Sequence, residues 1–245
     1  MFAPSNCPTP VSDGSSAEVY EQRMARELID NFRAFLDFDR LDRSGWFHCS
    51  DLHHKPGTVK FSPRRCVLQY LGVAQPHDFD NESAWAIARG SAVDKLAMKA
   101  IEASGWFLDA QPEFLDEQRR LRGHPDFAAP YGFDVVYGDV KATDDNMFRR
   151  YVGNPDWPLS QYYAWRQLQA YLDMSDTEFG FVIFFNAEWA GFRPKLHERI
   201  CVRRYYRDEP CIAGIRRDVA YLNESLEAYL AATTEEEQEA ALPRW

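Results

Sequence analysis

Residues 122–143, RGHPDFAAPYGFDVVYGDVKAT, constrain the fold of this chain more than any other stretch. Their composition predicts one strand over Arg119–Phe127 and another over Phe133–Lys141. Pro130 and Gly132 favour a turn between the two strands. We therefore expect two neighbouring strands of one sheet, joined by a short connection.

This arrangement would bring two aspartates together. Side chains alternate between the faces of a strand, so Asp139 and Lys141 share one face and Val140 points away. Across the turn, Asp126 would lie close to Asp139, with the backbone carbonyl of Val140 near the same point. These hard oxygen ligands suit Mg²⁺ or Mn²⁺. The ammonium of Lys141 can stabilise charge on a phosphate or orient an attacking water. The alternative is a surface hairpin with a salt bridge.

A second motif lies downstream, where Gln167 and Tyr171 are four positions apart in QLQAY. Residues i and i+4 lie on one face of a helix. Together with the Pro-Asp and Asp-Val-Lys of the predicted strands, the motif resembles the PD-(D/E)XK nuclease superfamily. More narrowly it resembles the RecB-like branch, which includes phage exonucleases and the nucleases of CRISPR adaptation. The resemblance implies that Gln167 and Tyr171 organise the site and contact DNA; the alternative is that Tyr171 is a core residue.

The resemblance also implies a fold class and further site residues. The fold would be α/β (α+β), a restriction-endonuclease-like core with a mixed central sheet flanked by helices. Many members of the branch carry R-G-x-x-x-H on an upstream helix, with the His near the metal. Here Arg89 and Gly90 are followed by Asp94 in place of the His. A charge on that helix's apolar stripe is costly unless it is paired or metal-bound, so we expect Asp94 to be a metal ligand; it would face solvent if the helix were rotated. Members also place a Glu on the strand before the Pro-Asp, for which Glu113 is the candidate, with Glu117 second.

The segment SPRRCVLQYLG, which contains Arg65 and Cys66, resembles a part of RecB-like nucleases where one cysteine can ligate an iron–sulfur cluster. Those enzymes take three more cysteines from the C-terminal region, where this chain offers Cys201 and Cys211, ten residues apart. That spacing departs from the family's, so we expect Cys66 to be a buried structural thiol. Arg65 and Arg89 are candidates for contacts with DNA phosphates.

Composition limits the classes of protein that this chain can belong to. The formal net charge of -10 argues against a broad basic surface for nucleic acid, although not against an enzyme with a local basic groove and its own metal ions. No stretch approaches the roughly 20 apolar residues that cross a bilayer, and the N-terminus lacks the pattern of a signal peptide. We expect a cytoplasmic protein without membrane contacts.

The remaining sequence predicts helices and strands around this centre. We expect an N-terminal arm and a helix packed on the core over residues 1–60, a nuclease domain over 61–232 and a solvated tail over 233–245. The predicted helices cover Ser16–Phe38, Asn81–Gly105, Leu159–Met174 and Pro210–Ala231, and the further strands cover Ala110–Asp116, Gly180–Ala187 and Glu198–Tyr205.

These motifs predict a metal-dependent DNA nuclease, in particular an exonuclease, that hydrolyses single- or double-stranded DNA. Its expected catalytic residues are Asp126, Asp139, Lys141 and Glu113, and its expected metal ligands are Asp94, Asp126, Asp139 and the carbonyl of Val140. Recombination and phage replication use this architecture, so a protein partner from either process and an oligomer are both compatible with it. Two alternatives stay open: a nuclease-like fold that serves as a DNA-binding or assembly module, and a nuclease that acts on RNA.

Overall fold

The computed structural model describes residues 45–52, 62–73, 81–104, 108–153, 163–188 and 199–243. All of these residues belong to one unit of the chain, residues 43–245. The predicted helix over Ser16–Phe38 lies outside the described residues. None of the helices in the described ranges is long and apolar enough to cross a membrane.

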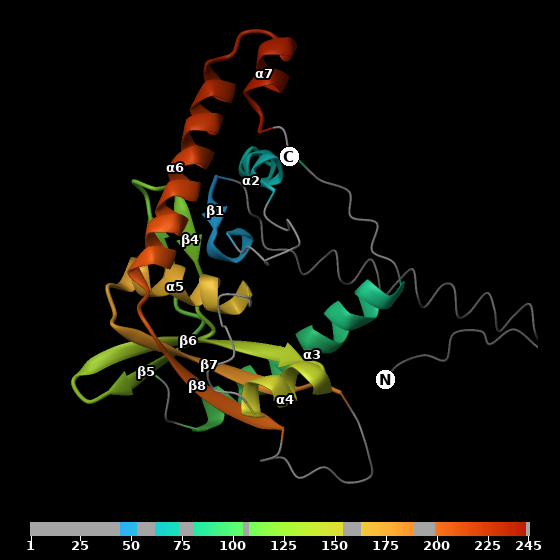
Figure 1. Ribbon diagram of the computed structural model, residues 1–245, viewed down its shortest axis with the longest axis vertical. Helices are drawn as coiled ribbons and strands as arrows, with labels where there is room; N and C mark the ends of the chain where they lie inside the picture. Colours follow the sequence, from blue (N-terminus) through green and yellow to red (C-terminus); the bar gives the residue numbers. More distant parts are fainter. Residues whose placement is uncertain are drawn as a thin grey trace, which may run out of the picture. The chain divides into compact units, whose positions relative to one another are not determined.

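A five-stranded mixed sheet forms the centre of the described part (Figure 1). Its strands, in spatial order, are β2 (Asp109–Ala110), β5 (Phe127–Tyr131), β6 (Asp134–Thr143), β7 (Phe179–Asn186) and β8 (Ile200–Tyr206). The β6–β7 pair is parallel, and the other pairs are antiparallel. The apolar run predicted as a buried strand is β7, which lies between β6 and β8. The mixed central sheet flanked by helices is the predicted fold class.

The β5–β6 hairpin matches the predicted pair of strands only in part: β6 covers most of the strand predicted over Phe133–Lys141, whereas the strand predicted over Arg119–Phe127 overlaps β5 only at Phe127. Its turn uses Gly132 at a φ of 65°, a left-handed conformation that glycine adopts without a steric penalty. Phe127 pairs with Gly138, and the Phe127 ring lies over this glycine. A Cβ atom at Gly138 would lie 2.1 Å from that ring. The pairing therefore depends on the absence of a side chain immediately before Asp139.

Helices cover both faces of this sheet. On one face, α3 (Asn81–Ser104) packs Ala97 and Ile101 against Phe127 and Val140. On the other face lie α4 (Asp145–Gly153) and α5 (Tyr163–Ser175), which bury their apolar residues against Val182 and Phe184 of β7. The sheet therefore has a different hydrophobic cluster on each face, and α5 packs in turn against α6 (Glu209–Ala231).

A second, smaller sheet departs from the sequence prediction. It contains β1 (Phe47–His48), β4 (Leu121–Gly123) and β3 (Phe114–Asp116) in that order. We had expected one strand over Ala110–Asp116 and another running on to Phe127. Instead the chain turns at Gln111 and Arg120, which have φ values of 56° and 52°. Pro125 lacks a backbone N–H and separates β4 from β5. Neither turn contains a glycine, so the sequence carried no strong signal for these breaks.

The C-terminal segment is the second departure. Residues 233–245 were expected to be a solvated tail, but Glu235–Ala241 form a helix, α7, that packs against α6 (Figure 1). Thr234 and Glu237 form a capping box at its start, in which each side chain bonds the other's backbone. Leu242, which follows α7, is only 4% exposed and belongs to the main hydrophobic cluster.

A short helix that the sequence analysis did not predict lies near the small sheet. This helix, α2 (Pro63–Tyr70), begins at Ser62, whose hydroxyl accepts a hydrogen bond from the N–H of Arg65. Pro63 occupies the first helical position, where its missing N–H has no cost. The 3-10 turn η1 (Cys49–Asp51) completes this side of the fold. Both elements contribute to the larger cluster, through Val67 of α2 and Cys49 of η1.

Candidate active site

The base of the β5–β6 hairpin brings Asp126 and Asp139 side by side. The N–H of Asp126 donates to the carbonyl of Gly138 at 2.9 Å. This hydrogen bond extends the pairing with β6 to the residue just before β5. The N–H of Val140 donates to Oδ2 of Asp126 at 2.6 Å. The Asp126 carboxylate is therefore fixed against β6 by a backbone donor, directly across from Asp139.

Lys141 lies on the same face of β6 as Asp139. Its Nζ is 2.5 Å from Oδ2 of Asp139, and Asp139 is only 1% exposed. Val140 points to the opposite face, where it packs with α3. Apart from the ion pair with Lys141, Oδ2 of Asp139 is a buried oxygen that accepts no hydrogen bond within the described residues. The two aspartates and the lysine thus converge as their alternation along the strands predicted.

The electrostatics of this point show an excess of negative charge. Burial raises the pKa of Asp139 to about 7; Lys141 opposes this shift, while Asp126 and Asp94 add to it. The pKa of Asp94, on α3, is raised to about 6, first by loss of solvent and then by Asp126, with Lys141 again opposing. Asp94 keeps an exposed side, so its loss of solvent is only partial. The carboxylates of Asp94 and Asp139 therefore both interact electrostatically with one cation, the ammonium group of Lys141, while the carboxylate of Asp126 adds negative charge beside them.

Gln167 and Tyr171, on α5, support the segment that leads into this site, residues 123–126, which we call the approach loop. Nε2 of Gln167 donates to the hydroxyl of Tyr171 at 2.5 Å, and that hydroxyl donates to the carbonyl of His124 at 3.0 Å. Both side chains are buried. A Cβ atom at Gly123 would lie 2.9 Å from the Tyr171 ring, so glycine leaves space for it. The structure places this pair as a support for residues 123–126 and away from the protein surface.

The fold resembles that of solved exonuclease structures. A crystal structure of an alkaline exonuclease, LHK-Exo, from Laribacter hongkongensis matches with a TM-score of 0.57 and 14% sequence identity, covering 81% of this chain and 95% of that chain. This chain shares its fold. LHK-Exo in complex with dAMP matches with the same TM-score and coverage at 16% identity. A phage-related exonuclease from Haemophilus somnus 129PT matches with a TM-score of 0.50 and 16% identity, covering 71% of this chain and 90% of that chain. No protein-family model and no curated protein sequence matches the chain.

Glu113 lies beside the approach loop. It forms an ion pair with Arg122 and lies 3.7 Å from Nε2 of His124. Burial lowers the pKa of His124, Arg122 lowers it further, and Glu113 opposes both. Glu113 therefore contacts the segment that leads to Asp126. Arg122 belongs to a basic cluster near the motifs for which contacts with DNA phosphates are expected, whereas the sequence did not single out His124, two residues before Asp126.

The two arginines predicted to bind DNA are in different places. Arg89 lies on α3, five residues before Asp94, and is partly buried. Arg65 lies on α2, which contacts β1 and α6. Only Arg89 shares an element with the group of carboxylates, so the structure brings the two arginines to separate surfaces.

Among the described residues, cysteines and histidines do not add metal ligands to the site at the hairpin. Cys66 is buried in the main cluster, as predicted for a structural thiol, and Cys201 and Cys211 are partly exposed. Within the described ranges, no three His, Cys, Asp or Glu side chains lie close enough together to hold a metal ion on their own. A metal at the hairpin would therefore need oxygen ligands beyond the side chains, such as the carbonyl of Val140 or water.

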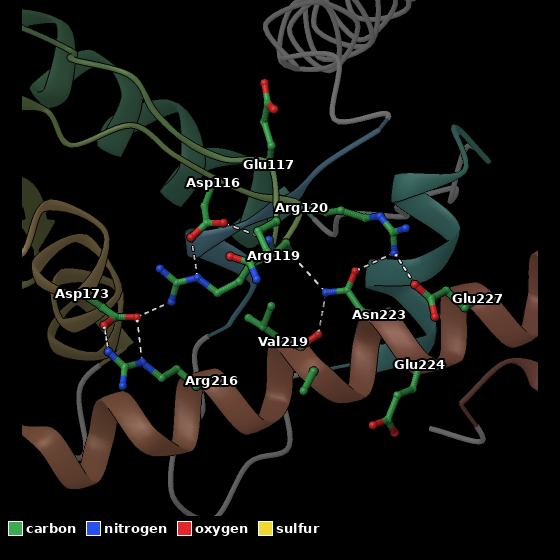
Figure 2. Close-up of a pocket in the computed structure, with 12 residues that line it drawn as sticks. Asp116, Glu117, Arg119, Arg120, Asp173, Arg216, Val219, Asn223, Glu224 and Glu227 are labelled. Atoms are coloured by element: carbon green, nitrogen blue, oxygen red, sulfur yellow. Dashed lines mark hydrogen bonds and ion pairs between the residues drawn. The ribbon is translucent and has the colours of Figure 1, made fainter.

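A surface pocket of about 750 Å³ lies elsewhere, between the β3–β4 turn and α6 (Figure 2). In it, the Asp173 carboxylate, almost fully buried, contacts Arg119 and Arg216, and Arg119 also pairs with Asp116. Arg216 holds the pKa of Asp173 below its usual range, and Arg119 acts in the same direction against the effect of burial. These ion pairs tie α5, the β3–β4 turn and α6 together. Because its central carboxylates already have arginine partners, this pocket is a structural junction, and the hairpin is the better candidate site.

Proposed function

We propose that this chain is a metal-dependent DNA nuclease, in particular an exonuclease. The observation that carries the proposal is the convergence of Asp126, Asp139 and Lys141 at the base of the β5–β6 hairpin. It occurs on a fold shared with exonuclease structures, one of which was solved with dAMP. A deoxynucleotide in that neighbour supports DNA as the substrate of this chain.

The residues present fit a divalent cation. Among the described residues, the buried Oδ2 of Asp139 has Lys141 as its one partner, and the raised pKa of Asp139 reflects a negative charge that this ammonium group does not fully compensate. Carboxylate and carbonyl oxygens are the ligands that Mg²⁺ and Mn²⁺ prefer. Asp126, Asp139 and the carbonyl of Val140 would hold the ion; Asp94 is not close enough to complete a set of three side-chain ligands among the described residues, so it would act through a bridging water. A cation bound there would supply Lewis-acid chemistry to a phosphodiester and its attacking water.

The other residues would bind and orient the substrate. Lys141 holds a positive charge beside Asp139, where it can stabilise negative charge that develops on a phosphate. Gln167 and Tyr171 would act as positioning residues, because their hydrogen bonds fix the carbonyl of His124 two residues before Asp126. Glu113 would act indirectly, by positioning the segment before Asp126 through its ion pair with Arg122. Arg89 and Arg65 would contribute contacts with DNA phosphates, Arg89 nearer the site.

The decisive experiment compares cleavage of labelled single- and double-stranded DNA and RNA in Mg²⁺, in Mn²⁺ and in EDTA. We expect the wild-type protein to degrade DNA with either metal and to leave it intact in EDTA. Asp139→Asn and Lys141→Ala should each lower the rate by at least about 100-fold. Glu224→Gln, an exposed change on α6, serves as the matched carboxylate control and should keep full activity.

Thermal melts of each variant separate loss of chemistry from loss of folding. Undiminished cleavage in both site variants would discard the proposal. Cleavage confined to RNA would assign the site to the RNA-directed alternative. Metal-independent DNA binding without any cleavage would assign the chain to the binding or assembly module.

A further inference from the structure

A second surface feature lies at the edge of the central sheet. An open groove of about 600 Å³ is lined by Trp165 of α5 and by residues 202–208. These residues form most of β8 and the two positions after it. In the described part of the chain, β8 is the outermost strand of the five-stranded sheet. The groove therefore follows a strand edge with no described neighbour on its outer side.

The groove is locally basic in a chain whose formal net charge is -10. Arg203, Arg204 and Arg207 line it together with a single acidic residue, Asp208. The Asp208 carboxylate is already used, because it caps α6 by accepting a hydrogen bond from the N–H of Cys211. Arg207 is paired with carboxylates. Among the described residues, neither Arg203 nor Arg204 has a carboxylate partner, and Arg203 donates instead to the backbone carbonyls of Tyr151 and Val152.

Arg204 lies on aromatic rings. Its guanidinium carbon is 5.1 Å from the centroid of Tyr206 and 5.5 Å from that of Phe179. Tyr206 is 54% exposed, and Phe179 packs edge-on against Tyr131 at 4.9 Å between centroids. Phe179 itself is only partly exposed. An exposed ring beside a guanidinium, as at Tyr206 and Arg204, is the combination by which proteins stack bases and bind the phosphates between them.

The strand register relates this groove to the candidate active site. Asp139 pairs with Val182 of β7, and Val182 pairs with Arg203 of β8. Residues directly opposite each other share a face of the sheet, so Arg203 lies on the face that carries Asp139, two strand spacings or about 10 Å away. Nη2 of Arg203 donates to the carbonyl of Tyr151 at 2.9 Å, which fixes the side chain on that face. Arg204 faces the other way, so the edge strand carries a cation on each side.

We propose that this edge groove binds single-stranded nucleic acid that crosses the sheet edge, from the face of Arg204 and Tyr206 to the face that Arg203 shares with Asp139. Arg203 and Arg204 contact its phosphates, and Tyr206 with Phe179 offers rings on which its bases stack. A polyanion fits the surface better than a second protein chain, because an apolar partner would bury the Arg204 charge without a counter-ion. The groove's role in feeding or releasing a strand rests on the proposed nuclease function, but its affinity for a strand does not.

The test measures binding of fluorescein-labelled (dT)20 to the full chain by anisotropy in EDTA, where no cleavage occurs. Arg204→Gln should weaken binding about 3- to 10-fold and reduce the slope of log affinity against log salt by about 0.7. Tyr206→Ala should weaken it roughly 5- to 100-fold, while Tyr206→Phe keeps the ring and should bind like wild type. Arg217→Gln, which removes an exposed charge on α6 outside the groove, is the matched control.

Cleavage of (dT)4 in Mg²⁺ distinguishes this proposal from the nuclease function. We expect the groove variants to cleave the tetranucleotide normally, and Asp139→Asn to bind (dT)20 normally without cleaving. The groove proposal is overturned if wild type does not bind (dT)20, or if Arg204→Gln and Tyr206→Ala bind as tightly as wild type. It is also overturned if these variants change only the sedimentation of the protein, which would make the edge an interface between copies.

Discussion

Asp139 is a buried carboxylate whose pKa lies well above its ordinary value. Its environment combines near-complete burial with two further carboxylates and one ammonium group. Such a site stores an unfavourable charge in the folded protein, and the molecule can relieve it by taking up a proton or a cation. Proton and metal are therefore expected to compete for the same position.

This competition gives a prediction for the metal-free protein. An unfolded Asp loses its proton near pH 3.8, whereas folded Asp94 and Asp139 hold theirs to about pH 6 and about pH 7. The folded state thus binds more protons between these limits, so the free energy of unfolding should fall as pH rises from about 4 to 7. In Asp139→Asn the fall should be shallower by up to about 1.4 kcal/mol per pH unit.

Urea denaturation in EDTA at intervals of half a pH unit measures this slope. Asp176→Asn, which makes the same chemical change at an exposed position, should keep the wild-type slope. Parallel curves for wild type and Asp139→Asn would show that Asp139 titrates normally. The slope is the quantity to compare, because the variant also leaves Lys141 without its partner.

At the scale of elements, the hairpin depends on contacts across its two strands. The ring of Phe127 occupies the space where Gly138 lacks a side chain. Gly138→Ala should therefore force the ring or the strand to move and should destabilise the protein by about 1–3 kcal/mol. It should also lower nuclease activity, because Asp139 is the next residue.

A matched glycine makes this prediction specific. Gly153 ends α4, and a Cβ atom there would meet nothing within 4 Å. Gly153→Ala should change the free energy of unfolding by no more than about 0.5 kcal/mol. Chemical denaturation of the two variants provides the comparison, and equal stabilities would contradict the packing argument.

The sequence predicted the parts of this hairpin that rest on local rules. The alternation of side chains along a strand predicted that Asp139 and Val140 face opposite sides of the sheet. The turn signals at Pro130 and Gly132 predicted that Asp126 lies next to Asp139. The same rules failed at Gln111 and Arg120, where non-glycine residues adopt positive φ and divide the predicted strands. They also could not show that Tyr171 is buried under Gly123, since this contact joins distant parts of the chain.

At the scale of the whole molecule, the C-terminal segment is part of the core. Leu242, three residues before Trp245, is buried, and an exposed ion pair of 2.8 Å joins Arg64 of α2 to Glu239 of α7. The capping box at Thr234 was present in the sequence, but the acidic run that follows favoured a solvated interpretation. The capping residues thus favoured a helix at this point, whereas the polarity of the segment favoured a tail exposed to solvent.

The burial of Leu242 and the ion pair of Glu239 should contribute differently to the free energy of unfolding. Leu242→Ala removes a buried side chain and should cost about 2 kcal/mol of stability. Glu239→Gln removes an exposed ion pair, which solvent screens, and should have no measurable effect. Thermal and urea unfolding of both variants test this order, and a larger loss for Glu239→Gln would contradict it.

The order of elements along the chain has a consequence for synthesis. The hairpin with Asp126, Asp139 and Lys141 precedes α5 and β7, which supply Tyr171 and the parallel neighbour of β6. A chain emerging from the ribosome therefore displays its acidic hairpin before the helix that fixes the carbonyl of His124 exists. The arrangement at the hairpin becomes complete only after α5 and β7 have followed, about 40 residues after the end of β6, so the proposed nuclease site would form only once β7 has been made.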